Sequence, residues 1–139
     1  MSIDACHLID LPRFADPRGN LSFVEGGSHI PFDRVYYIWG IPDAAVRGAH
    51  GHRALQQFLT ATGNEFDVLV DDGKERRTFR PDRPDQGLYI CPMIWRDVTN
   101  FSDGAVCLAL ASLPFDEADY YRNYDAFLRE ATGKPGDRS

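Results

Sequence analysis

Residues 57–80, QFLTATGNEFDVLVDDGKERRTFR, give the clearest indication of fold class in this chain. In the segment EFDVLV (65–70) apolar residues recur at every second position, the period of a half-buried β-strand. The tripeptide DDG (71–73) that follows is a hairpin-turn signal. The stretch therefore predicts one strand at 65–70 and an antiparallel partner at 75–80.

Similar short segments, rich in β-branched and aromatic residues, recur on both sides of this hairpin. Glycine, proline and aspartate separate them and mark the turns. Further strands are expected at residues 20–25, 35–39, 57–62, 87–91 and 105–112. Many short strands at regular spacing favour an all-β barrel or sandwich.

The C-terminal part of the chain has a different pattern. Residues 119–128 place apolar and aromatic side chains at helical spacing, which predicts one short helix against the barrel. Residues 132–139 are largely polar, contain Pro135, and are expected to form a flexible tail. No repeat or linker divides the sequence, so residues 1–139 are predicted to be a single domain.

Composition and charge exclude several functional classes. The net charge of -6 and the pI of about 5.1 disfavour nucleic acid as a partner, because phosphate binding needs a basic surface. Three cysteines without a disulfide-framework spacing, and no apparent signal peptide, indicate a reducing, cytoplasmic compartment. The longest apolar run, residues 105–111, is too short to span a bilayer. We therefore expect a soluble protein that binds neither nucleic acid nor a membrane.

The segment RGAHGH (47–52) carries the strongest chemical signal. If it is a strand, His50 and His52 point to the same face, because residues two apart do. Imidazole accepts and returns protons near neutrality. The pair therefore indicates either a metal site or proton-transfer chemistry, with two structural histidines as the alternative without a function.

An H-x-H on a strand of a small all-β domain resembles the first motif of the cupin superfamily. The glutamate position of that motif holds Gln56 or Gln57, and in the second motif Asp97 replaces the last histidine. A transition metal needs three or four N, O or S ligands, of which Asp97 could supply one. Arg96 beside it argues against a metal. We favour a metal-free pocket with an acid–base pair, and expect no cofactor.

Longer segments make the resemblance specific: residues 16–25, 30–42, 47–52, 70–73, 87–102 and 110–128. Together they resemble the sugar-nucleotide 3,4-ketoisomerases, metal-free cupins that act on dTDP-4-keto-6-deoxy-D-glucose in deoxysugar biosynthesis. The resemblance implies a cupin-like β-barrel (jelly roll) and a dTDP-linked 4-keto-6-deoxy sugar as substrate. It also implies a homodimer, usually with strands exchanged between subunits.

Two positions depart from the usual family pattern. Gly51 replaces an alanine between the histidines, and Arg53 replaces the lysine after them. These departures leave open whether the nucleotide is dTDP, and whether carbon 4 of the product has the gluco or galacto configuration.

Moving a carbonyl from carbon 4 to carbon 3 requires a base near pH 7, a donor to the developing oxyanion and exclusion of water. We expect His50 to be the base and His52 to share the proton transfer, although their roles can be exchanged. Tyr36 and Arg34 are two apart and would share a strand face. Tyr36 is the candidate pocket hydroxyl that hydrogen-bonds the sugar oxygens, with core packing as the alternative.

Arg47 is the first candidate for binding the pyrophosphate, because the planar guanidinium suits bidentate contacts. Gln57 is a candidate for a hydrogen bond in the pocket, and Trp95 for stacking on the base or sugar. The alternatives are a surface ion pair for Arg47 and core packing for Trp95. Weaker candidates for substrate binding are Arg18, Arg34 and Arg96.

Two other functions remain compatible with the sequence. One is a 3,5-epimerase-like or metal-dependent cupin reaction on a related sugar. The other is a non-catalytic cupin that binds a nucleotide sugar. Two adjacent titratable side chains favour an enzyme, because binding alone does not require them.

Overall fold

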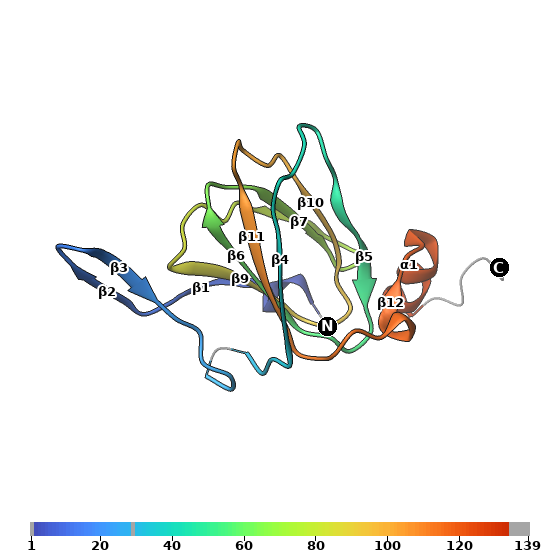
Figure 1. The fold of residues 1–139 in the computed structure, drawn as a ribbon. Coiled ribbons are helices and arrows are strands. Elements are labelled where there is room, and N and C mark those ends of the chain that lie inside the picture. The colour runs from blue at the N-terminus through green and yellow to red at the C-terminus, as the bar shows by residue number, and fades with distance from the viewer. Residues whose placement is uncertain (1, 29, 134–139) are drawn as a thin grey trace.

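Two five-stranded antiparallel sheets face each other in the computed structural model, which describes residues 2–28 and 30–133 (Figure 1). The first sheet has the order β1 (His7–Asp10), β9 (Gln86–Ile90), β6 (Gln57–Gly63), β11 (Val106–Ala111) and β4 (Arg34–Ile38). The second has the order β12 (Tyr120–Tyr121), β5 (Arg47–His52), β10 (Trp95–Thr99), β7 (Asp67–Asp71) and β8 (Arg76–Phe79). The predicted hairpin is present, since β7 pairs with β8. The all-β prediction is therefore confirmed.

The main core lies between the two sheets. Val68 and Val70 of β7 are fully buried against Leu88 and Ile90 of β9, as the alternating pattern predicts. Strand β6 is buried along most of its length because its outer face is covered as well. There Phe58 packs in a second cluster with residues of the N-terminal segment and of β11.

A two-stranded hairpin, β2 (Arg13–Asp16) and β3 (Gly19–Ser22), projects away from the two sheets (Figure 1). It exposes Phe14 and Leu21 to solvent, with 62% and 59% of their surface accessible.

The C-terminal helix α1 (Tyr124–Thr132) packs outside the second sheet, where Phe127 contacts Trp95 and Tyr121. Its predicted position, 119–128, is wrong at both ends. Residues 120–121 instead form β12, which pairs with β5, and a short 3₁₀ helix (Glu117–Asp119) precedes it. The helix begins only after Asn123, whose side chain caps it by accepting a hydrogen bond from a backbone N–H.

The described part of the chain ends at Gly133, the residue that follows this helix. Thr132 is the last residue of the helix, so the predicted tail starts one residue too early, and residues 134–139 lie outside the described part. In that described part we find no helix with the length and hydropathy to cross a membrane.

Candidate active site

Strand β5, which carries the two histidines, contains a β-bulge. Its register with β10 shifts at Ala49, which has no partner there, and both Gly48 and Ala49 have a positive φ. An extra residue in one strand reverses the direction in which the preceding side chains point. Arg47 therefore faces the same cavity as His50, although the two are three positions apart and a regular strand would point them to opposite faces.

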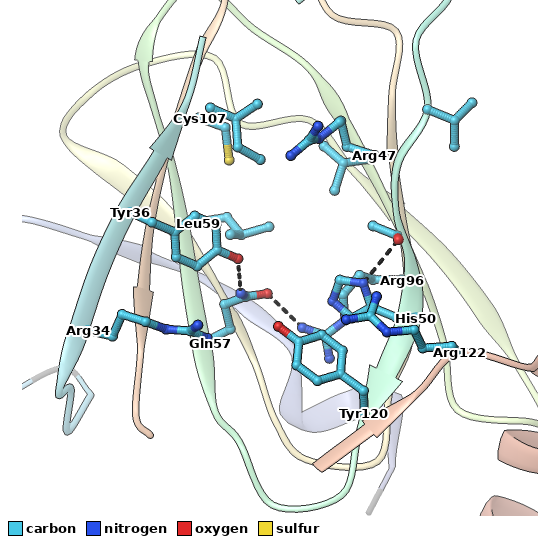
Figure 2. A pocket seen from close by; sticks show the side chains of 14 residues that line it. Arg34, Tyr36, Arg47, His50, Gln57, Leu59, Arg96, Cys107, Tyr120 and Arg122 are labelled. Atoms are coloured by element: carbon cyan, nitrogen blue, oxygen red, sulfur yellow. Dashed lines mark hydrogen bonds between the residues drawn. The ribbon is translucent and has the colours of Figure 1, made fainter. Parts of the chain in front are cut away.

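That cavity has a volume of about 390 Å³ and lies between the two sheets (Figure 2). Side chains of β4, β5, β6, β10, β11 and β12 form its wall. Four arginines line it, and no aspartate or glutamate does: Arg34, Arg47, Arg96 and Arg122. Arg122 pairs with Glu117, and the other three have no carboxylate partner among the described residues. A protein of net charge -6 thus concentrates positive charge at one cavity, which suits an anionic ligand such as a diphosphate.

The hydrogen bonds of both histidines determine where their protons are. His50 Nδ1 lies 3.0 Å from the Gly48 carbonyl oxygen, and His52 Nδ1 lies 3.0 Å from Asp119 Oδ2. A carbonyl and a carboxylate can only accept, so each neutral ring carries its proton on Nδ1 and a lone pair on Nε2. Neither Nε2 has a hydrogen-bond partner among the described residues. Both imidazoles are therefore oriented to accept a proton at Nε2.

Burial keeps these imidazoles neutral. Desolvation and the nearby Arg96 guanidinium lower the pKa of His50 to about 4 and that of His52 to about 2. The two rings meet edge to face with their centroids 4.8 Å apart, so the structure brings the predicted pair together. His50 lines the cavity, whereas His52 is 1% exposed behind it. His50 is therefore the histidine with access to the cavity, and its role as the base stays a prediction.

Asp119 is a site residue that the sequence analysis missed. Its carboxylate accepts hydrogen bonds from His52 and from the backbone N–H groups of Ala54 and Leu55. It ends the 3₁₀ helix before β12, and 67 positions separate it from His52, so no local motif connects them. Its strong hydrogen bonding and low exposure, 8%, identify it as the residue that orients His52.

Tyr120 and Arg122 were also missed, because the sequence pattern assigned this segment to a helix. The centroid of the Tyr120 ring lies 5.0 Å from that of His50 and 4.4 Å from that of His52, and the Arg122 guanidinium lies over the Tyr120 ring, 4.1 Å from its centroid. Tyr120 lies beside the two histidines because its strand, β12, pairs with β5. Arg122 follows β12 directly. Tyr120 therefore contributes to the cavity rather than to helix packing.

On the opposite side, Tyr36 and Arg34 of β4 both face the cavity, as predicted, while Tyr37 points outward and is 64% exposed. Gln57 Nε2 donates to Tyr36 Oη at 2.6 Å. Gln57 Oε1 in turn accepts from Arg96 Nη1 at 2.7 Å, as Figure 2 shows. The predicted site residues Tyr36, Gln57 and Arg96 thus form one hydrogen-bonded chain.

The other predicted ligand contacts on β10 are not supported. Trp95 and Asp97 alternate with Arg96 and lie on the outer face of the sheet, where Trp95 packs on Tyr124 and Phe127. Trp95 is therefore a packing residue under the helix, and the prediction that it stacks on a ligand in the cavity is wrong. Asp97 was the candidate third ligand of a metal site, but it lies on this outer face and does not line the cavity.

Arg18 does not line this cavity either. It lies in the turn of the projecting hairpin, its side chain is 90% exposed, and it pairs with Asp16. In the described ranges, no group of three or more His, Cys, Asp or Glu residues is arranged to hold a metal ion.

Two facing antiparallel sheets, with a histidine pair and an arginine-lined cavity between them, define a cupin-like protein with a site for an anionic ligand. The family described as "FdtA: WxcM-like, C-terminal" matches residues 4–132. The chain therefore belongs to this WxcM-like/FdtA family of TDP-sugar 3,4-ketoisomerases, which confirms the resemblance found in the sequence.

Individual relatives cover almost the whole chain. The TDP-4-oxo-6-deoxy-alpha-D-glucose-3,4-oxoisomerase of Aneurinibacillus thermoaerophilus is 38% identical over 124 residues, which are 88% of this chain and 89% of that protein.

Solved structures agree with this relationship. A histidine-to-asparagine variant of the 3,4-ketoisomerase QdtA from Thermoanaerobacterium thermosaccharolyticum, in complex with TDP-4-keto-6-deoxyglucose, has a TM-score of 0.89 and 34% identity. That match covers 94% of this chain and 96% of QdtA. The TDP-quinovose 3,4-ketoisomerase WlaRB of Campylobacter jejuni has a TM-score of 0.84 and 43% identity, covering 89% of this chain and 97% of WlaRB.

Proposed function

We propose that this protein is a sugar-nucleotide 3,4-ketoisomerase that moves the carbonyl of TDP-4-keto-6-deoxyglucose from carbon 4 to carbon 3. The observation that carries the proposal is His50, a neutral imidazole that lines a cavity with arginines and no carboxylate, and whose Nε2 has no hydrogen-bond partner among the described residues. The relatives that share this fold at 34 to 43% identity support the choice of substrate.

The proposed reaction moves one carbon-bound proton and needs no redox step. His50 Nε2 takes the proton from carbon 3, which the neighbouring ketone acidifies. The C–H electron pair forms the double bond between carbons 3 and 4, and the charge moves to the carbonyl oxygen on carbon 4. Return of a proton to carbon 4, uptake of a proton by the oxygen on carbon 4 and loss of the proton from the oxygen on carbon 3 then place the ketone at carbon 3 and a hydroxyl at carbon 4. The ring of His52 lies 4.8 Å from that of His50, which supports a share of His52 in these transfers.

The test is to incubate the purified protein with TDP-4-keto-6-deoxyglucose and to follow the sugar by NMR. We expect a 3-keto product and, in heavy water, deuterium at carbon 4. Inversion at carbon 5 would instead identify an epimerase, and binding without turnover would identify a non-catalytic protein. Either result contradicts the proposal.

The low pKa of His50 predicts the pH dependence of the reaction. Because only the neutral ring can accept the proton, and its pKa is lowered to about 4, kcat/KM should be constant from about pH 8 to about pH 5. It should fall as the pH decreases further through 4, where His50 becomes protonated. Initial rates measured across this range check the expectation. A decline that already begins near pH 6.5, the value of an unperturbed histidine, would contradict it.

The nucleotide is expected to contact Arg47. Arg47 lines the cavity, and no carboxylate of the described residues lies within 4.0 Å of its guanidinium, so the group is free to bind a phosphate. Arg47→Ala should weaken TDP binding by about 1.5–3 kcal/mol, the cost of a lost charged hydrogen bond. Isothermal titration with TDP measures this, with Arg129→Ala on the outer helix as the matched control. An unchanged affinity would remove Arg47 from the binding site.

We further propose that the protein is a homodimer with strands exchanged between subunits. Strand β4 is an edge strand; Val35 and Tyr37 on its outer side and Trp39 directly after it are 51, 64 and 70% exposed. The projecting hairpin exposes Phe14 and Leu21 in the same way. A second copy that exchanges hairpins would pair the edge and cover these side chains.

Sedimentation should therefore give twice the monomer mass at micromolar concentration, and Trp39→Glu should shift the equilibrium toward monomer. A monomeric wild-type protein would contradict the proposal. Such a dimer is also the condition under which Arg18, at the hairpin turn, can reach a substrate, namely that of the partner subunit.

A further inference from the structure

The chain from Arg96 through Gln57 to Tyr36 has only one possible direction. A guanidinium can only donate, so the group of Gln57 that faces Arg96 Nη1 must be its amide oxygen. The amide nitrogen of Gln57 then faces Tyr36 and must donate to it. Turning the amide around would place two donors against each other in a buried site. The oxygen of Tyr36 is therefore an acceptor in this contact.

This direction leaves the hydroxyl proton of Tyr36 unused by the protein. Among the described residues, no acceptor lies within hydrogen-bonding distance for the Tyr36 O–H. The side chain lines the cavity together with His50. Burial also raises the pKa of Tyr36, which keeps the hydroxyl protonated at neutral pH.

We propose that Gln57 is a positioning residue, which directs the Tyr36 hydroxyl proton into the cavity as the hydrogen-bond donor to the oxyanion that forms on carbon 4. It does so by occupying the lone pair of Tyr36 rather than by binding the substrate itself. This inference rests on the proposed ketoisomerase activity. It assigns Tyr36 to stabilisation of the intermediate and His50 to proton transfer.

Arg96 fixes the orientation of the Gln57 amide and adds a positive charge at the end of these hydrogen bonds. It is 1% exposed, and no carboxylate of the described residues pairs with it. Its other hydrogen bond goes to the backbone carbonyl of Ile94, so its orientation is held from two sides. A buried, unpaired cation is costly unless negative charge appears nearby. The enediolate is such a charge, and the chain Arg96–Gln57–Tyr36 is polarised toward it.

The test is Gln57→Glu, which reverses the direction of the hydrogen bond while keeping the shape of the side chain. A carboxylate at position 57 accepts from Arg96 and also from Tyr36, so the hydroxyl proton turns away from the cavity. We expect kcat to fall about 100-fold, the typical effect of one lost oxyanion donor, with KM changed by less than about threefold. Stability should not fall, because the introduced carboxylate would form an ion pair with Arg96. A merely structural role predicts the opposite, a less stable protein with a normal kcat.

A double-mutant cycle with Tyr36→Phe shows whether the effect passes through the hydroxyl. Gln57→Glu should lower kcat no further when Tyr36 is already phenylalanine. The matched control is Gln56→Glu, because Gln56 bonds Tyr89 outside the cavity and this change should leave kcat unaltered. If Gln57→Glu does not fold, Gln57→Met, which cannot donate to Tyr36, replaces it in the same cycle.

Three outcomes would overturn the inference. The first is a Gln57→Glu enzyme whose kcat stays within threefold of wild type. The second is an equal decrease of kcat from Gln57→Glu in the wild-type and the Tyr36→Phe backgrounds. The third is a decrease of kcat/KM that comes from KM alone. A wild-type protein that does not convert the substrate at all refutes the proposed function instead. The two failures are therefore distinguishable.

Discussion

His50→Asn should abolish the exchange of the carbon 3 proton with solvent deuterium and lower kcat by about 10²- to 10⁴-fold, the range for loss of a general base. The asparagine amide can still donate to the Gly48 carbonyl, as His50 Nδ1 does, so the bulge in β5 should remain intact. No atom of asparagine reaches the position of Nε2, so only the proton acceptor is lost. Nucleotide affinity and thermal stability should remain close to those of the wild-type protein.

NMR in heavy water measures the exchange directly, and titration with TDP serves as the control for binding. His52→Asn is the matched comparison, because it removes the second imidazole of the same strand. We expect it to slow turnover but to leave some exchange at carbon 3. If instead the His50 variant exchanges at the wild-type rate and the His52 variant does not, the two roles are reversed. Full activity in both variants would make the pair structural.

Asp119→Asn should give the second large effect, through the tautomer of His52. The carboxylate accepts three hydrogen bonds, two of them on Oδ2, from His52 Nδ1 and the Leu55 N–H. An amide nitrogen in that place donates, so the ring must move its proton to Nε2 and loses the lone pair on the side of His50. We expect kcat to fall about 100-fold. The Leu55 N–H also loses its acceptor, which should cost about 1–3 kcal/mol of stability.

Two measurements separate these consequences. Nitrogen-15 NMR of the imidazoles should show the change of tautomer at His52, and urea unfolding should show the loss of stability. Asp125→Asn, an exposed substitution on helix α1, is the control and should alter neither. An unchanged His52 tautomer together with normal turnover would remove Asp119 from the catalytic arrangement and leave it a purely structural role.

Most strands of the two sheets could be predicted because their signals are local, whereas β1, β10 and β12 were not predicted. Alternating burial in β7 and the turn after it depend only on neighbouring residues, and the structure has this hairpin as expected. The C-terminal helix could be predicted in kind but not in position. Residues 120–121 have helical spacing with the residues after them, yet their backbone pairs with β5, a contact that no local pattern encodes.

In the candidate site, too, some positions could be predicted from local spacing and others could not. Sequence spacing was enough to show that His50 and His52 share a face, and that Tyr36 and Arg34 do, because side chains two apart on a strand point in one direction. The position of Arg47 beside them needed the folded structure, since a regular strand would have pointed it away and the bulge at Ala49 turns it back.

The tertiary structure also decided which side chains of β10 face the cavity. Trp95 and Arg96 are neighbours in sequence, and which of them enters the cavity depends on the pairing of β10 with β5 and β7. The chemical groups and their local period were present in the sequence. Which face of β10 lines the cavity, and which distant carboxylate orients His52, depended on contacts between segments that only the folded chain brings together.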